Sequence, residues 1–195
     1  RNLVERAQNA SESSGQASRR MTLEFAESMN IQRAIVYEER DRLIKQEGRL
    51  DAIVEKALRS VFSSVVHKKE YKEPVAFYRY ILDNVSYQVD PEKAHQTFHS
   101  KKAKENFLWE IAKSELEAKY EVLGTDEVIA QFQRMAILKA IDENWVEQVD
   151  YLQQLRMALS GQYTSQKNPL VEFFQEAYQS FDRMKGAAKE QMVRN

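Results

Sequence analysis

Glu92, His95 and His99 have residue types and a spacing that could bind a metal ion. Glu92 and His95 form one ExxH pair, and His99 follows His95 at i+4, so one helical face could carry all three. A di-iron site in a helical bundle needs two ExxH pairs and further inward-facing carboxylates, and this chain has one pair. Because Lys93 and Gln96 lie among these residues, we expect a solvent-exposed surface here and no bound metal.

The motifs of other common catalytic sites do not occur in the sequence. There is no GxxxxGK[ST] phosphate loop, no GxSxG elbow, no HExxH helix and no cysteine. The basic clusters at 67–69 and 99–104 are not interleaved with aromatic residues that would stack on bases, and the net charge is -1. We therefore expect this chain by itself to be no enzyme, to bind no cofactor and to have no nucleic-acid partner.

The elements that would carry any site are helices. Only five Gly and three Pro occur in 195 residues, too few for the turns of a β fold, while helix formers are abundant. The predicted fold class is therefore all-α. No apolar run reaches the length of a membrane span. The chain begins at Arg1 without a targeting signature, so we expect a piece of a longer protein.

The first section, from about Asn2 to Gln46, is predicted to be one long helix of roughly 65 Å. Its stripe of small or apolar residues has helical spacing and is narrow, so larger elements should pack against it. Gly48 is the expected stop. The stripe comprises Leu3, Ala7, Ala10, Ser14, Ala17, Met21 and Phe25.

The middle section, from Asp51 to Gly124, is predicted to contain shorter helices. Asp51 should cap the first of these, Pro74 should start the next, and Asp90-Pro91 reads as a further helix start. A longer helix should extend from Lys101 to Leu123 and end at Gly124. This section reads as a compact helical insert.

The third section, 125–195, is predicted to be a helical hairpin. Thr125 should cap the first helix and Asn168-Pro169 should start the second, with Tyr163 at the tip of the loop between them. The apolar positions of the first helix are Val128, Phe132, Met135, Leu138, Ile141, Trp145, Val149, Leu152, Leu155 and Leu159. Those of the second are Leu170, Phe173, Ala177, Phe181, Met184 and Ala188.

Two separated blocks of the sequence carry a family resemblance. The stretches ILKAIDENWVEQVDYLQQLR and QKNPLVEFFQEAYQSFDRM closely resemble the two-helix finger of the bacterial preprotein translocase ATPase SecA. VERAQ and LEFAESMNIQRAIVYEERDRLI resemble the long scaffold helix of the same family. The resemblance implies a scaffold helix at 1–50, a helical wing at 51–124 and a two-helix finger at 125–195.

Departures from the family pattern indicate an accessory SecA. Phe25-Ala26-Glu27-Ser28 replaces the usual Tyr-Asp-Asp-Val, and the usual Trp-x-x-His has become Trp145 to Gln148. The resemblance implies a protein at the cytoplasmic face of the membrane, whose motor domains bind ATP and Mg²⁺. Its implied partners are a SecY-type channel, a secreted preprotein, the motor domains in cis and accessory export proteins.

The resemblance also implies roles for particular residues. An aromatic residue at the finger tip touches the moving polypeptide in this family, which assigns substrate or channel contact to Tyr163 with Gln162 and Thr164. The alternative for Tyr163 is a ring folded back on the hairpin core. The pattern of the scaffold helix assigns contact with the motor domains to Gln32, Arg33, Tyr37 and Arg40.

Two functions from other classes stay open at this point. One is a free-standing helical adaptor that binds an amphipathic partner helix through an apolar face. The other is an enzyme with a helical metal site, and it depends only on Glu92 and the His pair.

Overall fold

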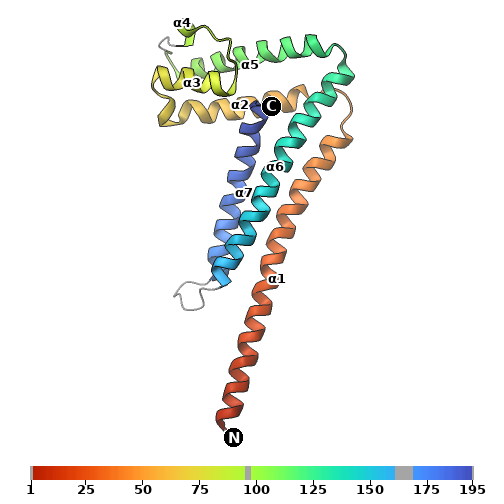
Figure 1. Cartoon of the computed structure of the whole chain (residues 1–195), viewed down its shortest axis with the longest axis vertical. Coiled ribbons are helices and arrows are strands. Elements are labelled where there is room, and N and C mark those ends of the chain that lie inside the picture. The colour runs from red at the N-terminus through yellow and green to blue at the C-terminus, as the bar shows by residue number, and fades with distance from the viewer. Residues whose placement is uncertain (1, 95–97, 161–168, 195) are drawn as a thin grey trace. The chain divides into compact units, whose positions relative to one another are not determined.

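The computed structural model describes residues 2–94, 98–160 and 169–194, and every element in these ranges is helical (Figure 1). This confirms the all-α prediction. The elements are α1 (Asn2–Lys45), α2 (Asp51–His67), the 3-10 turn η1 (Lys69–Tyr71), α3 (Pro74–Asn84), α4 (Pro91–Ala94), α5 (Lys101–Leu123), α6 (Asp126–Ser160) and α7 (Pro169–Arg194).

Several helix ends follow local capping chemistry, and those at Thr125 and Gly124 were predicted from the sequence. The Thr125 hydroxyl accepts a hydrogen bond from the backbone N–H of Val128 at the start of α6, and Ser100 caps α5 in the same way. Gly124 ends α5 with φ of 82°, a left-handed conformation that favours glycine. The prediction for Asp51 was wrong, because Leu50 is the N-cap of α2 and Asp51 is its first residue.

The chain forms two compact units, and each draws on separate stretches of sequence. The first comprises Arg1–Asp41 with Trp145–Met184, and the second comprises Arg42–Asn144 with Lys185–Asn195. Three helices, α1, α6 and α7, contribute residues to both units.

The core of the first unit lies where α1 meets the hairpin helices α6 and α7. It contains Phe25, Leu152, Leu159, Phe173 and Ala177. The predicted stripe of α7 is confirmed, because Phe173, Ala177, Phe181 and Met184 are all buried. Of the predicted α1 stripe, Phe25 is buried and Met21 packs against this core, while the side chains of the other five lie outside the described part.

The core of the second unit is formed by α2, α3 and α5. Leu58, Phe62, Phe77, Ile81 and Leu108 are buried in one cluster, as the helical spacing of their segments predicts. The Phe77 ring also lies beneath the Lys104 ammonium at 3.9 Å from its centroid, so part of the basic 99–104 run contributes to packing.

The predicted apolar seam of α6 was wrong over its first three turns. Val128 is 41% exposed and Met135 is 71% exposed, while Gln133 is buried. The side chain of Gln133 accepts a hydrogen bond from the backbone N–H of Leu50 and donates to Asp51 and to the Tyr120 hydroxyl. Because these bonds satisfy the amide, a polar residue occupies a core position and the apolar ones beside it face solvent.

Candidate finger and scaffold contact site

A buried hydrogen-bond network joins the three helices of the first unit. The Gln148 amide nitrogen on α6 donates to Gln32 Oε1 of α1 at 3.0 Å and to Ser180 Oγ of α7 at 2.9 Å. The Gln32 amide nitrogen and the Ser180 hydroxyl both donate to the backbone carbonyl of Ala177, at 2.9 and 3.1 Å. Since all three side chains are buried, sliding one helix along another would leave polar groups unpaired.

Aromatic packing near this network fixes α1 against α7. The rings of Phe25 and Phe173 meet edge to face, with centroids 4.4 Å apart and an interplanar angle of 60°. Both side chains are almost completely buried. Their contact and the bond from Gln32 to Ala177 show that α1 and α7 run in the same direction.

A polar cluster bridges α6 and α7 at the surface of the same unit. The Tyr151 hydroxyl donates to the Glu176 carboxylate at 2.7 Å, and the Arg183 guanidinium donates to the same oxygen. The bond from Tyr151 is the main cause that lowers the pKa of Glu176, and the bond from Arg183 adds to it. The same bond raises the pKa of Tyr151, because the phenol is held in its protonated form.

The structure separates the four predicted motor contacts on α1 into two groups. Arg33 and Tyr37 are exposed, Arg40 is half-buried, and their i, i+4, i+7 spacing places all three on one helix face. The Arg40 guanidinium lies 5.4 Å from the centroid of the Tyr37 ring. Gln32 differs, because its side chain is buried against α6 and α7.

The predicted tip residues Gln162, Tyr163 and Thr164 lie outside the described residues. The structure does place the two helices that flank them, since α6 ends at Ser160 and α7 begins at Pro169. The start of the second hairpin helix at Pro169 is therefore confirmed.

The metal hypothesis loses its geometric basis. Glu92 lies in α4, which spans Pro91–Ala94, and His99 precedes α5, so the expectation that they share one helix face was wrong. Both residues are exposed, and His95 lies outside the described ranges. Within the described ranges, no three His, Cys, Asp or Glu residues are grouped as a metal site would require.

Sequence reasoning did not find the network of Gln32, Gln148 and Ser180. The family comparison drew attention to Gln148 as a departure and to Gln32 as a motor contact, but neither signal indicated that the two side chains are buried together.

None of the described helices combines the length and the hydrophobicity that a membrane-spanning segment needs.

These features define an all-helical scaffold domain in which a long helix is locked to a two-helix hairpin. The chain belongs to the SecA wing and scaffold domain family, whose profile matches residues 1–195. It is 49% identical over 195 residues to the protein translocase subunit SecA 2 of Streptococcus sanguinis, which covers 100% of this chain and 25% of that protein.

Two further relatives bear the same name. The protein translocase subunit SecA 2 of Streptococcus gordonii is 46% identical over 193 residues, which cover 99% of this chain and 24% of that protein. The SecA 2 of Staphylococcus aureus (strain Newman) is 33% identical over 193 residues, with the same coverage. The chain thus spans about a quarter of the length of these relatives, and their names agree with the expected accessory type of SecA.

Proposed function

We propose that this chain is the scaffold, wing and finger module of an accessory SecA-type protein export motor. It couples the motion of motor domains to a preprotein at a SecY-type channel, at the cytoplasmic face of the membrane. Those motor domains would lie elsewhere in a longer protein and bind ATP and Mg²⁺, while this module holds no nucleotide. Accessory export proteins are further partners in this proposal.

The observation that carries the proposal is the locked packing of α1 against α6 and α7. Three buried polar side chains and the Phe25–Phe173 contact resist sliding, so a displacement of α1 would move both hairpin helices with it. The Arg33, Tyr37 and Arg40 face of α1 would receive that displacement from the motor domains. Gln32, beneath this face, would pass it on to the hairpin.

At the other end of the hairpin, Tyr163 with Gln162 and Thr164 would touch the translocating chain. A tyrosine suits this role because its ring offers apolar area and its hydroxyl a polar end, so it can contact many sequences.

The test places a photocrosslinking amino acid at position 163 in a complete translocase that contains this chain. Adducts to a stalled preprotein or to the channel are expected, with position 153, on the exposed side of α6, as the control. In parallel, Tyr163→Ala should lower transport while changing the free energy of unfolding by no more than about 0.5 kcal/mol.

Unchanged transport, no adducts and a loss of about 3 kcal/mol or more in the free energy of unfolding would together assign Tyr163 to the hairpin core.

An adaptor function has one observation in its favour. Val171, Phe174 and Tyr178 are exposed on α7 at i, i+3, i+7 spacing and so form an apolar stripe on the hairpin. The complete reading frame separates the two functions. Walker motifs in the same frame would support the motor module, and their absence would support the adaptor.

A further inference from the structure

The last turns of α7, residues 187–194, are held less firmly than the turns before them. In the earlier part of the helix, Phe173, Ala177, Phe181 and Met184 are buried. Among residues 187–194, all of which the structure describes, Ala188 is the one buried side chain, and it is small. Residues 190–193 are half-buried. We call residues 187–194 the α7 strap.

Surface contacts attach the α7 strap to the rest of the second unit. The Glu190 carboxylate lies 3.1 Å from the Lys68 ammonium, and these side chains are 40% and 39% exposed. Arg194 Nε donates a hydrogen bond to Asn84 Oδ1 at 2.9 Å, also at the surface. Because water and salt compete with such exposed contacts, each adds little to the stability of the attachment.

The more buried contact of the α7 strap can also be released at low cost. The Asn144 amide nitrogen donates to Gln191 Oε1 at 2.7 Å and to the backbone carbonyl of Ala140 at 2.8 Å. If the strap leaves, Asn144 keeps its bond to Ala140, and water can take the place of Gln191. Detachment therefore does not leave this buried amide without a partner.

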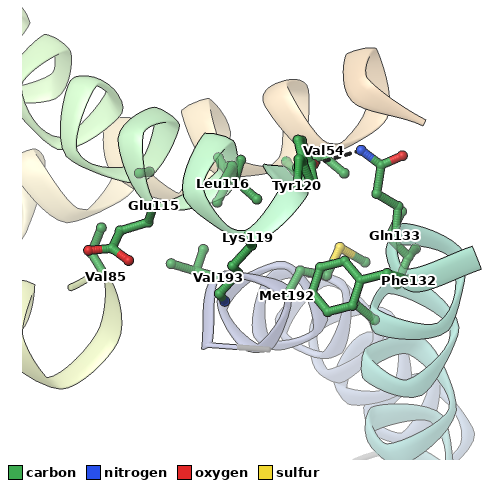
Figure 2. A pocket seen from close by; sticks show the side chains of 15 residues that line it. Val54, Val85, Glu115, Leu116, Lys119, Tyr120, Phe132, Gln133, Met192 and Val193 are labelled. Atoms are coloured by element: carbon green, nitrogen blue, oxygen red, sulfur yellow. Dashed lines mark hydrogen bonds between the residues drawn. The ribbon is translucent and has the colours of Figure 1, made fainter. Parts of the chain in front are cut away.

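The apolar contact of the α7 strap is incompletely packed. Val193 packs against the core of the second unit and is itself half-buried. A cavity of about 70 Å³ lies beside it, and Figure 2 shows Met192 and Val193 around this cavity together with Val54 and Leu116. Side chains that line a void lose contact atoms on that side, so Met192 and Val193 gain less from packing than a filled core would provide.

Gly186 lies directly before the α7 strap and weakens the helix at that point. It is exposed, and a Cβ atom at this position would meet no atom within 4 Å, so packing does not require glycine. A glycine in a helix interior is less favourable than alanine by about 1 kcal/mol. Interrupting α7 at Gly186 is therefore easier than at its neighbours.

We propose that the α7 strap opens from the second unit as one cooperative segment, with Gly186 as the point at which the helix breaks. A detached helix of this length is marginal in water, so the open strap also loses its helical hydrogen bonds. Opening exposes the cavity wall on α2 and α5, which includes Ala57 and Ala112. The strap thus controls the exposure of an apolar surface. This inference does not depend on the export function, because it concerns packing within this chain alone.

The first test is hydrogen exchange of single amides in the intact chain, followed by NMR. A cooperative strap gives residues 187–192 similar protection factors, with a step at Gly186 to the higher values of residues 173–184. Simple fraying would instead make protection fall steadily toward the end of the helix. The experiment therefore distinguishes a segment that opens as a unit from an ordinary helix end.

Matched variants identify the break point. Gly186→Ala should slow the exchange of residues 187–192 by about fivefold, because alanine favours the closed helix. Gly15→Ala makes the same change in α1 and should leave these amides unaffected. Glu190→Gln should speed their exchange by one common factor of up to about fivefold, since it removes the ion pair with Lys68. Glu172→Gln, at an exposed position earlier in α7, is its control.

The second test measures exposure of the cavity wall. The chain has no cysteine, so one introduced thiol reports one position. Ala112→Cys at the cavity should react with DTNB at least about tenfold faster than Val65→Cys, which is buried in the same cluster but does not line the cavity. Each rate is divided by that of the urea-unfolded variant. Adding Gly186→Ala should slow the reaction at position 112 about fivefold. Ala57→Cys replaces Ala112→Cys if the latter fails to fold.

Three results would overturn the proposal. Protection could fall steadily from residue 187 to the end of α7, Gly186→Ala could leave the exchange of residues 187–192 unchanged, or the thiols at positions 112 and 65 could react at equal rates. Equal rates would mean that this end of α7 leaves the core only when the whole chain unfolds.

Discussion

Gln148 is one of three buried polar residues in the network of the first unit, and it bonds to both of the others. Its amide nitrogen donates hydrogen bonds to both Gln32 Oε1 and Ser180 Oγ. Gln148→Leu keeps the approximate volume but leaves those two buried oxygens without this donor. The free energy of unfolding should therefore fall by about 1–3 kcal/mol.

Urea unfolding measures this loss. The control is Gln153→Leu, at an exposed position of the same helix, which should stay within about 0.5 kcal/mol of the original chain. Similar stability of the two variants would show that the network does not lock the helices.

Tyr151 and Glu176 make a second prediction at the residue scale. The Tyr151 hydroxyl is the largest cause that lowers the pKa of Glu176 below its ordinary value of 4.5. A carboxyl group with a lowered pKa stabilises the folded state above that ordinary value, and this contribution is lost as the pH falls through the folded pKa. In Tyr151→Phe the pKa of Glu176 should therefore rise toward 4.5.

Carboxyl ¹³C NMR titration reports this pKa directly. The stability difference between Tyr151→Phe and the original chain should be present at neutral pH and disappear in acid. An unchanged Glu176 titration would assign the lowered pKa to Arg183 alone.

At the scale of elements, α7 has two adjacent phenylalanines, one buried and one exposed. Phe173 is 0% exposed and meets the Phe25 ring, while Phe174 is 40% exposed. Phe173→Ala should cost about 3–5 kcal/mol, because it removes a buried ring and leaves a cavity. Phe174→Ala should cost much less, and thermal or urea unfolding of the pair compares the two with the same chemical change. Equal costs would mean that α7 does not hold the register described above.

The same two helices show how far sequence patterns could predict the fold. The stripe of α7 was predictable because Phe173, Ala177, Phe181 and Met184 recur at helical spacing on one face. In α6 apolar residues occur around the helix, so periodicity could not tell that Gln133 and Gln148 would be buried while Val128 and Met135 face solvent. Their burial depends on acceptors and donors from distant segments, such as Leu50 and Ser180, which no local pattern contains.

The residues of the candidate site were also predictable only in part. The family resemblance selected Arg33 and Tyr37, which are exposed on α1 and so available for contact. It also selected Gln32, whose burial follows from the packing of α6 and α7 against α1. The cavity lined by α2, α5, α6 and α7 had no sequence signal, because each of these helices contributes only part of its wall.

At the scale of the whole chain, α1 changes from exposed to packed along its length within the first unit. Val4 and Leu23 are 61% and 70% exposed, whereas Phe25, Gln32 and Val36 are buried. Amides of residues 5–20 should therefore exchange hydrogen through openings of low free energy, and those of residues 29–41 should be protected by the packing on α6 and α7. Hydrogen exchange followed by mass spectrometry would measure this gradient within one helix.

The gradient also tests the proposed coupling role of α1. If motor domains cover its exposed face in a longer protein that contains this chain, protection of residues 5–20 should rise there, because packing on this part of the helix makes its opening more costly. Residues 29–41, which include the proposed motor contacts Arg33, Tyr37 and Arg40, are already protected by the hairpin in the isolated chain, so their exchange should change less. Equal exchange of residues 5–20 in both proteins would mean that nothing outside the unit packs on this part of α1, and the helix could not receive motion through it.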